Sequence, residues 1–451
     1  MLKLLPGRAS IWKVTIQILI LSFPLVYLTR MVEATPLQQT VSDLMSWGDN
    51  YAGQLGNGSF VEDINPTHTI AMNDLAEIAA GSAHSLALKN DGTVWSWGND
   101  RYGQLGDGLS SNLSTPKNIP FQLPVKEIAT GYNHSLAVTT DGSIYTWGCN
   151  SVGQLGDGSK SDRNTPYHLQ GLINITKVAG GGEHSLALKS DGTVWAWGGN
   201  RYGQLGDGTQ TDRLYPVKIT GLSGIKSITA GYYSSTALKD DGTVWSWGSN
   251  EYGQLGNGNR TNSPSPVEVS GLSGITAISC GYNHCLALAS TGVIWGWGRN
   301  DVGMLGDGGK EANSSLPVQV LTINDAIAIA AGGFFNLALQ TDHTAWSWGF
   351  NSNGQLGDGT RANRSSPVQV RGINSSITFI AAGGGFSLAS SSTRPWDLNG
   401  DHMINVLDIT SLGAYFGKSG LPGTLIGDIN LDGTVNVLDV TILGAHFGET
   451  Y

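Results

Sequence analysis

The sequence predicts an all-β chain that closes into a seven-bladed β-propeller and ends in a small helical domain. Three observations predict this organisation. A motif of about 50 residues occurs seven times, short stretches in each copy alternate apolar and polar residues, and residues 396–451 contain a duplicated acidic pattern. Repeats of this period are typical of radial or stacked architectures.

The repeat is anchored by the dipeptide Trp-Gly. A box of the form GQLGDG or GQLGNG follows each copy, with GMLGDG in the sixth, and a proline follows each box. Successive copies lie 50 residues apart, and the last lies 51 residues after the sixth. The tryptophans are Trp47, Trp97, Trp147, Trp197, Trp247, Trp297 and Trp348.

Each unit contains the pattern of a four-stranded antiparallel sheet. In residues 76–97, an apolar stretch ends at Gly81, and two alternating stretches, HSLALK and TVWSW, flank Asn-Asp-Gly. Asp-Gly between alternating stretches predicts a hairpin with a primed turn. We expect a fourth strand to start at each proline, as in residues 216–220 and 266–270, because proline is tolerated at the start of a strand. Four-stranded sheets repeated radially form the blades of a propeller.

The two ends of the array predict how the ring closes. The first unit begins with its third strand, at residues 41–47, whereas the last stretch, residues 377–390, supplies only first and second strands. We therefore expect one blade to take two strands from each end, which hides the edge strands. The propeller is predicted to span residues 35–392.

Charge and cysteine content exclude several classes of protein. The chain has 25 Lys and Arg against 35 Asp and Glu, a net charge of −10, and no basic stripe. A nucleic-acid partner is therefore not expected. The three cysteines, Cys149, Cys280 and Cys285, are too few for a disulfide framework and are expected to be small buried residues.

The first 34 residues have the pattern of a secretory signal peptide. Basic residues precede an uncharged run from Val14 to Leu28, and Val32-Glu33-Ala34 is a suitable cleavage site. The run is shorter than the roughly 20 residues that a spanning helix needs. We predict a protein that is secreted or held at the cell surface. An uncleaved anchor is the alternative, and membrane attachment is expected only in that case.

No residue set in the repeats predicts catalysis. One position of the repeat is a histidine in four units: His84, His134, His184 and His284. We expect Ser235, Asn336 and Ser387 to occupy the same position in the other units. A catalytic histidine is needed once, whereas a repeated one suits blade packing with its ring nitrogen bonded to the backbone. The aspartates of the GQLGDG boxes suit turn caps. The chain is predicted not to be an enzyme.

Positions that break the repeat predict a target-binding face. The turn between first and second strands carries aromatic residues in some units only, at the same end of the ring as the loop after Trp-Gly. Aromatic residues and arginines are enriched in binding hot spots. Alternatively, these side chains pack the loops. The predicted face comprises Tyr132, Tyr232, Tyr233, Tyr282, Phe334 and Phe335.

Residues 397–417 and 428–448 are two copies of one loop-and-helix pattern, offset by 31 residues. Oxygen-bearing residues at this spacing suit the six to eight ligands of Ca²⁺, and a backbone carbonyl serves at the seventh position. The sequence predicts two Ca²⁺ sites. The first comprises Asp397, Asn399, Asp401, Met403, Asn405 and Asp408, and the second Asp428, Asn430, Asp432, Thr434, Asn436 and Asp439.

The repeat resembles the family named for the regulator of chromosome condensation. That family carries G-x-x-H-[ST]-x-x-L, D-G-x-V-[WY]-x-W-G-x-N and G-Q-L-G, and these motifs occur here from residue 41 to about 390. The resemblance implies a seven-bladed propeller. The founding member exchanges nucleotide on a nuclear GTPase, but this chain is acidic and predicted to be exported, so no GTPase partner is expected. Similar secreted bacterial propellers include inhibitors of β-lactamases.

The doubled acidic pattern resembles a type I dockerin domain over residues 396–451. The resemblance implies two Ca²⁺ ions and docking to a cohesin on a scaffold or cell surface. His402 replaces the glycine usual at the sixth position of the first loop. The positions that cohesins usually contact are Val406, Leu407, Val437 and Leu438 here, rather than hydroxyl pairs. These apolar pairs could instead pack the helices together or against the propeller.

Together these features predict an exported, non-enzymatic recognition or scaffold protein. The propeller face would bind a protein or surface polymer, and the tail would attach the protein to a cohesin or the cell surface. One alternative is a secreted inhibitor of a hydrolase. Another is a carbohydrate-active component of a polysaccharide-degrading complex, which would need a carboxylate pair. Glu183 and Glu251 are the acids on this face that fall outside the repeat register.

Overall fold

The computed structural model describes residues 41–309, 312–373, 376–393, 406–419 and 434–445. The predicted signal segment, residues 1–34, lies outside these ranges, as do most of the predicted Ca²⁺ ligands. Within the described ranges, no helix is long and apolar enough to cross a membrane.

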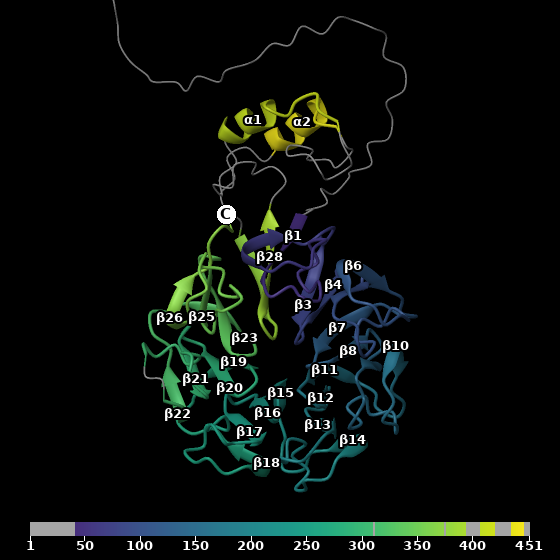
Figure 1. The fold of residues 1–451 in the computed structure, drawn as a ribbon, viewed down its shortest axis with the longest axis vertical. Coiled ribbons are helices and arrows are strands. Elements are labelled where there is room, and N and C mark those ends of the chain that lie inside the picture. The colour runs from purple at the N-terminus through teal and green to yellow at the C-terminus, as the bar shows by residue number, and fades with distance from the viewer. Residues whose placement is uncertain (1–40, 310–311, 374–375, 394–405, 420–433, 446–451) are drawn as a thin grey trace, which may run out of the picture. The chain divides into compact units, whose positions relative to one another are not determined.

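Seven four-stranded antiparallel sheets are arranged around a central axis (Figure 1), as the sequence predicts. We number the blades 1 to 7 from the N-terminus and give each from its innermost to its outermost strand. Blade 1 is β27 (Ser376–Ala382), β28 (Phe386–Thr393), β1 (Val41–Gly48) and β2 (Asp63–His68). Blades 2 to 4 are β3 (Leu75–Ala80), β4 (His84–Lys89), β5 (Val94–Gly98) and β6 (Leu113–Ile119); β7 (Val125–Thr130), β8 (His134–Thr139), β9 (Ile144–Gly148) and β10 (Arg163–His168); and β11 (Ile175–Gly180), β12 (His184–Lys189), β13 (Val194–Gly198) and β14 (Arg213–Lys218). Blades 5 to 7 are β15 (Ile225–Ala230), β16 (Ser234–Lys239), β17 (Val244–Gly248) and β18 (Ser263–Glu268); β19 (Ile275–Cys280), β20 (His284–Ala289), β21 (Ile294–Gly298) and β22 (Ser314–Gln319); and β23 (Ala326–Ala331), β24 (Phe335–Gln340), β25 (Ala345–Gly349) and β26 (Arg364–Gln369).

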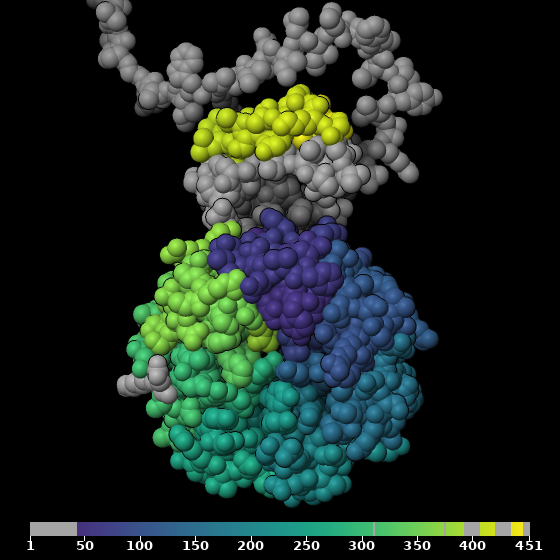
Figure 2. Space-filling view, in the orientation of Figure 1, coloured from purple at the N-terminus to yellow at the C-terminus, as the bar shows by residue number. Residues whose placement is uncertain are grey.

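The predicted closure is confirmed. β1 from the N-terminal end pairs with β28 from the C-terminal end over eight residues, from Val41 opposite Thr393 to Gly48 opposite Phe386. Figure 2 shows the purple start of the propeller lying directly against its yellow-green end. Blade 1 is thus built from two strands of each end of the array, and this pairing closes the ring.

Two local expectations are corrected. Each outer strand begins before its proline: Pro216 is the fourth residue of β14 (Arg213–Lys218), an edge strand, where a missing N–H is tolerated. The Asn-Asp-Gly turn of blade 2 has positive φ at Gly92 (82°) but not at Asp91. This matches a type I turn followed by a left-handed glycine rather than a primed turn.

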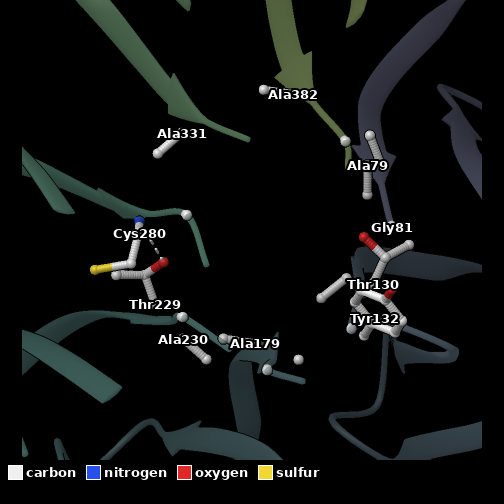
Figure 3. Close-up of a pocket in the computed structure, with 18 of the residues that line it drawn as sticks. Ala79, Gly81, Thr130, Tyr132, Ala179, Thr229, Ala230, Cys280, Ala331 and Ala382 are labelled. Carbon is white, nitrogen blue, oxygen red and sulfur yellow. Dashed lines mark hydrogen bonds between the residues drawn. The ribbon is translucent and has the colours of Figure 1, made fainter. Parts of the chain in front are cut away.

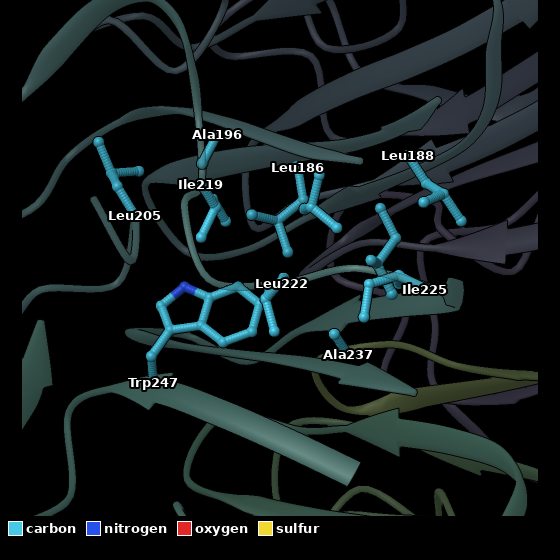
Figure 4. Packing of buried hydrophobic residues seen from close by; sticks show 11 residues of the cluster. Leu186, Leu188, Ala196, Leu205, Ile219, Leu222, Ile225, Ala237 and Trp247 are labelled. Atoms are coloured by element: carbon cyan, nitrogen blue, oxygen red, sulfur yellow. The ribbon is translucent and has the colours of Figure 1, made fainter. Parts of the chain in front are cut away.

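The apolar core lies between the blades, where the two faces of neighbouring sheets meet. Between blades 4 and 5, Leu186, Leu205 and Ile219 pack against Trp247 (Figure 4). The tryptophan of each Trp-Gly motif is fully buried. Its Nε1–H donates to a main-chain carbonyl of the preceding blade, as from Trp247 to Gln204 at 2.9 Å. Gly206 leaves room for this ring, because a Cβ there would lie 2.7 Å from Trp247 Nε1. The GQLG box therefore supplies both the hydrogen-bond acceptor and the space for the tryptophan side chain of the next blade.

All three cysteines are buried, as expected, but two of them also form a bridge that the sequence analysis does not predict. Cys280 and Cys285 are directly opposite each other on β19 and β20 and form a disulfide. Cys149 is free and buried. Two cysteines five residues apart, flanking a turn in an alternating pattern, were the signal for this bridge, and counting cysteines alone does not reveal it.

Two short helices form the described part of the C-terminal region. α1 (Val406–Gly413) and α2 (Val437–Ala445) share a small core of Leu412, Val435 and Leu443. They begin at equivalent positions of the two predicted loops. The described geometry therefore agrees with a duplicated loop-and-helix unit.

Candidate functional site

A closed ring of backbone hydrogen bonds surrounds one mouth of the central axis. In every blade, an N–H in the turn between the first two strands donates to a carbonyl in the turn of the next blade. The donors and acceptors are Ser82 to Tyr132, Tyr132 to Gly181, Gly182 to Tyr232, Tyr232 to Tyr282, Tyr282 to Gly333, Gly333 to Gly383 and Gly384 to Gly81, at 2.9–3.2 Å.

Glycines permit this close approach. A Cβ added at Gly131 would lie 2.7 Å from the carbonyl oxygen of Gly181 and 2.1 Å from Cε1 of His134. The glycine of the G-x-x-H motif is thus required because both the neighbouring turn and the side chain three residues later occupy that space.

Three of the predicted face residues meet over this mouth. The ring centroids of Tyr132, Tyr232 and Tyr282 lie 5.1–5.6 Å from one another. Phe334 packs 5.2 Å from Tyr282, and Tyr233 packs 4.5 Å from Tyr232. Five of the six residues therefore form one continuous, half-buried aromatic cluster.

Blades without an aromatic residue make room for this cluster. The turn positions equivalent to the three central tyrosines are glycines in three other blades. A Cβ at Gly384 would lie 2.7 Å from Tyr282 Oη, and one at Gly182 would lie 2.9 Å from Tyr232 Cδ1. Burial raises the pKa of Tyr282 well above its usual value, so its hydroxyl stays neutral. We call Tyr132, Tyr232, Tyr233, Tyr282 and Phe334 the tyrosine cluster.

Phe335, the sixth predicted face residue, does not belong to the cluster. It is fully buried on β24, where its side chain fills the space that a histidine fills in other blades. A Cβ at Gly332 would lie 2.5 Å from its ring. The prediction that Phe335 contacts a target is therefore wrong, because alternate residues of a strand point to opposite faces.

Arginines surround the tyrosine cluster and stack on tyrosines. Arg101 lies 5.5 Å from the ring of Tyr102, and Arg201 lies 5.0 Å from that of Tyr202. Arg299 lies 4.9 Å from the ring of Phe334 and bonds Asp301 at 2.5 Å. Such stacking orders the arginine stems and leaves guanidinium edges to donate hydrogen bonds.

Tyr51 adds a freely accessible ring to the same end of the propeller, since its side chain is 64% exposed. We call Tyr51, Arg101, Arg201 and Arg299 the arginine rim. Together with the tyrosine cluster, the rim presents aromatic and guanidinium groups around the mouth.

The two acids considered for catalysis are in different surroundings. Glu183 is half-buried, and burial raises its pKa while the charge of Arg201 opposes the rise. Asp212 also acts on Glu183, whereas Glu251 is exposed. Glu183 lies in the turn between β11 and β12 of blade 4, and Glu251 lies in the loop between β17 and β18 of blade 5.

The repeated histidines connect blades. Nε2 of His84, His134 and His184 lies 2.8–3.0 Å from the hydroxyl of Ser135, Ser185 and Ser235, and Nε2 of His284 lies 2.7 Å from Oδ1 of Asn336. The expected backbone acceptor is wrong. Residues at the histidine position in the other blades are Ser234, Phe335 and Phe386, one before those we assigned.

The partners fix the tautomer of these histidines. Ser185 donates its own proton to the carbonyl of Gln154 at 2.7 Å, so its oxygen accepts from His134 Nε2–H. Burial lowers the pKa of His134 to about 4 and that of His184 to about 3. These rings are neutral packing groups at physiological pH, which agrees with a structural role.

The loop after each Trp-Gly is held by a buried amide. Nδ2 of Asn150 donates to Oδ1 of Asp157 at 3.0 Å and to the carbonyls of Ser159 and Ser161. Oδ1 of Asp157 in turn accepts from the N–H of Ser159, as expected for a turn cap. In blade 2, Asp100 replaces the asparagine and lies fully buried near Asp107.

Replacing Asp100 by asparagine is expected to stabilise the protein at neutral pH. Burial raises the pKa of Asp100 to about 6, with the Leu105 N–H opposing and Asp107 adding to the rise. Because the folded state holds this proton more tightly, the native aspartate loses stability as pH rises from 4 to 7. We expect Asp100→Asn to gain about 1–2 kcal/mol over that range after allowing for solvent screening.

Chemical denaturation at pH 4.5 and pH 7.5 would measure the gain. Asp241→Asn is the matched control, because the hydroxyl and N–H of Thr243 lower the pKa of that exposed carboxyl. The control should be less stable than the native chain at neutral pH. An equal effect of Asp100→Asn at both pH values would contradict the prediction.

Only part of the predicted Ca²⁺ ligand set is described. Asp397, Asn399, Asp401, Met403, Asn405, Asp428, Asn430 and Asp432 lie outside the described residues. Asp408 and Asp439, the last predicted ligand of each loop, are fully buried in the first turns of α1 and α2. Asn436 caps α2 by accepting from the N–H of Leu438, and Asp439 accepts from the N–H of Asn436 at 2.7 Å. The described donors are hard oxygens and fit Ca²⁺.

Comparisons with known proteins agree with the geometry of the ring. A profile of the RCC1-like domain matches residues 43–389. The structure of Prp20p from Saccharomyces cerevisiae is 26% identical, with a TM-score of 0.71, and the match covers 79% of this chain and 92% of that one. Human WBSCR16 is 23% identical, with a TM-score of 0.72, covering 78% of this chain and 99% of that one, and shows the fold alone. No curated protein sequence matches the chain significantly. Since the profile covers most of the sequence, the chain belongs to the RCC1-like domain family.

Proposed function

We propose that this chain is an exported, non-enzymatic recognition protein whose propeller binds a protein or surface polymer through the tyrosine cluster and the arginine rim. RCC1-like propellers bind proteins. Prp20p has binding properties toward Gsp1p and histones, and a second structure shows Kap60 bound to yeast RCC1 (Prp20). The observation that carries the proposal is the clustering of aromatic and arginine side chains at one mouth, where they depart from the repeat.

The partner is proposed to differ from those of Prp20p. This chain has a net charge of −10, which disfavours nucleic acid, and we propose neither a nucleic-acid nor a GTPase partner. The absence of a catalytic role is likewise a proposal. It is supported by the neutral, buried state of the repeated histidines.

Export is supported by two independent features. Residues 1–34 have the pattern of a signal peptide, and Cys280 and Cys285 form a disulfide in the wall of the ring. Disulfides persist in oxidising compartments outside the cytosol. We therefore propose a secreted or surface-held protein.

The C-terminal region is proposed to bind two Ca²⁺ ions and to attach the protein to a cohesin-bearing scaffold or the cell surface. Val406, Leu407, Val437 and Leu438 are 62%, 55%, 64% and 55% exposed, and the core shared by α1 and α2 is built from other residues. This exposure favours a role in docking over packing of the two helices against each other. When bound, Ca²⁺ would add its binding free energy to the stability of the folded domain.

Calorimetric titration of the full chain with Ca²⁺ tests the tail. We expect two bound ions, and Asp408→Asn or Asp439→Asn should each remove one, because each variant loses a carboxylate ligand. Asp241→Asn, in an exposed propeller turn, is the control and should bind two. Absence of Ca²⁺ binding by the native chain would remove the attachment half of the proposal.

Site-directed photocrosslinking tests the face. A photoreactive amino acid at Tyr51 should trap a discrete partner on cells that make the protein. The same group at Ile173, which is 59% exposed in a connection at the opposite end of blade 4, should not. Equal labelling from both positions would contradict a specific face.

The trapped partner also separates the alternatives. A hydrolase whose activity falls on binding would indicate a secreted inhibitor using the same face. A carbohydrate-active role would instead require Glu183. Equal activity of Glu183→Gln and the native chain on a polysaccharide panel would remove that alternative.

A further inference from the structure

The seven inner strands enclose an axial cavity of about 350 Å³. Its wall is made of small side chains from every part of the ring, and Figure 3 shows Ala79, Ala179, Ala230, Ala331 and Ala382 around an empty centre. Tyr132, Tyr232 and Tyr282 line one end. The cavity therefore shares these three tyrosines with the tyrosine cluster, whereas the rest of its wall comes from the inner strands.

One ionisable side chain lines this chamber besides the tyrosines, among the residues described. Glu77, on β3, accepts from the N–H of Ile128 at 3.0 Å through Oε2. Glu127 and Lys177, on the next two inner strands, act on it electrostatically. Lys177 and Lys126 act on Glu127 in turn.

The Glu77 carboxyl is therefore the acid in the chamber wall with which a bound cation could pair. Burial raises its pKa to about 8, and the charge of Glu127 adds to the rise, while the Ile128 N–H and Lys177 oppose it. At neutral pH Glu77 is thus mainly protonated. A cation that reached it would displace that proton.

We propose that the chamber binds a linear aliphatic diamine, with one ammonium group on the Glu77 carboxylate and the hydrocarbon stem along the alanine wall toward the tyrosines. This site shares its tyrosine end with the target face, but Glu77 lies outside that face and the site does not depend on the tail. The ligand class follows from the order of surfaces along the axis: a carboxyl, an apolar wall and then aromatic rings.

The dimensions suit such a ligand. Glu77 accepts a hydrogen bond from the N–H of Ile128, which lies four residues before Tyr132 on one inner strand and its turn. Four residues of extended chain span about 13 Å. A four-carbon diamine is shorter than this span. Its second ammonium group would face the tyrosine rings, to which cation–π interaction would attract it. A monoamine lacks this contact and should bind more weakly.

The proton on Glu77 gives the site a signature. Because an ammonium ion displaces this proton, binding should release up to one proton at pH 7 and tighten as pH rises toward 8. At higher pH the affinity should level off and then fall as the amine loses its own proton, near pH 10. Ionisation of Glu127, Lys177 and Lys126 would shift these values but not their direction.

Isothermal titration of the full chain with 1,4-diaminobutane at pH 7, in two buffers of different ionisation enthalpy, tests the site. We expect saturable binding with proton release, weaker binding of butylamine and none of 1,4-butanediol. Glu77→Gln should lower affinity at least tenfold and abolish proton release. Glu268→Gln, on outer strand β18, should match the native chain.

A second variant keeps the proposal testable if the Glu77→Gln substitution impairs folding. Ala179→Val narrows the chamber from one wall without removing charge and should weaken the diamine more than a single ammonium ion. Circular dichroism confirms that each variant is folded. No binding by the native chain, equal binding of 1,4-butanediol, or unchanged binding and proton release in folded Glu77→Gln would each overturn the proposal.

Discussion

A chain that ends at Ile373 is expected not to fold into a stable ring. This truncation removes β27 and β28, which supply the inner half of blade 1. Leu44 then loses the buried cluster partners Phe386 and Leu388. Loss of several large buried contacts costs about 2–5 kcal/mol each, and the total exceeds the roughly 5–15 kcal/mol that stabilises a typical domain.

Size-exclusion chromatography and thermal circular dichroism would show the loss as aggregation and the absence of a cooperative transition. A chain that ends at Thr393 is the control, because it lacks α1 and α2 but retains the eight residue pairs between β1 and β28. A cooperative transition in the shorter chain, within a few degrees of the control, would mean that closure contributes little.

Trp247→Ala is expected to be the most damaging single substitution among the repeats' aromatic residues, together with its equivalents in other blades. Trp247 is fully buried between blades 4 and 5 and donates to the carbonyl of Gln204. A large-to-small change at such a site costs about 3–5 kcal/mol through the cavity it leaves. Urea denaturation would measure the loss as a lower midpoint.

Trp245, two residues earlier on the same strand, is the matched control. It is only partly buried and packs at the margin of the same cluster. Trp245→Ala should cost less than half as much as Trp247→Ala. Equal costs would show that the inter-blade position of Trp247 is not what makes it important.

The sequence predicts the strands of the ring well because the same strand pattern occurs seven times. Alternation around Asn-Asp-Gly locates the second and third strands of every blade, and the unequal ends of the array predict the pairing of β1 with β28. The predicted starts of the outer strands are wrong because we expected each strand to begin at its proline, such as Pro216. The outer strand of a blade is an edge strand, where the missing N–H of a proline inside the strand costs little.

The site is predicted less completely because it depends on contacts between units. Aromatic residues in the turns identify the tyrosine cluster, but a sequence pattern does not separate Phe334 from its buried neighbour Phe335. The serine that accepts from His84, His134 or His184 is 51 residues away, in the next blade. The axial chamber is equally hidden, since each inner strand contributes only a few small residues to it.

The ring of hydrogen bonds around the mouth has a consequence for where the chain can begin. Its seven donors all point the same way around the axis, and the bond from Gly384 to Gly81 joins blade 1 to blade 2, so the ring is unbroken where the two ends of the array meet. Val41 and Thr393 lie opposite each other, so a short linker can join them. A circular permutant opened in the exposed connection before Ile225, with whole blades at both ends, would keep every one of these bonds. The ring of hydrogen bonds therefore does not require the chain termini to lie in blade 1.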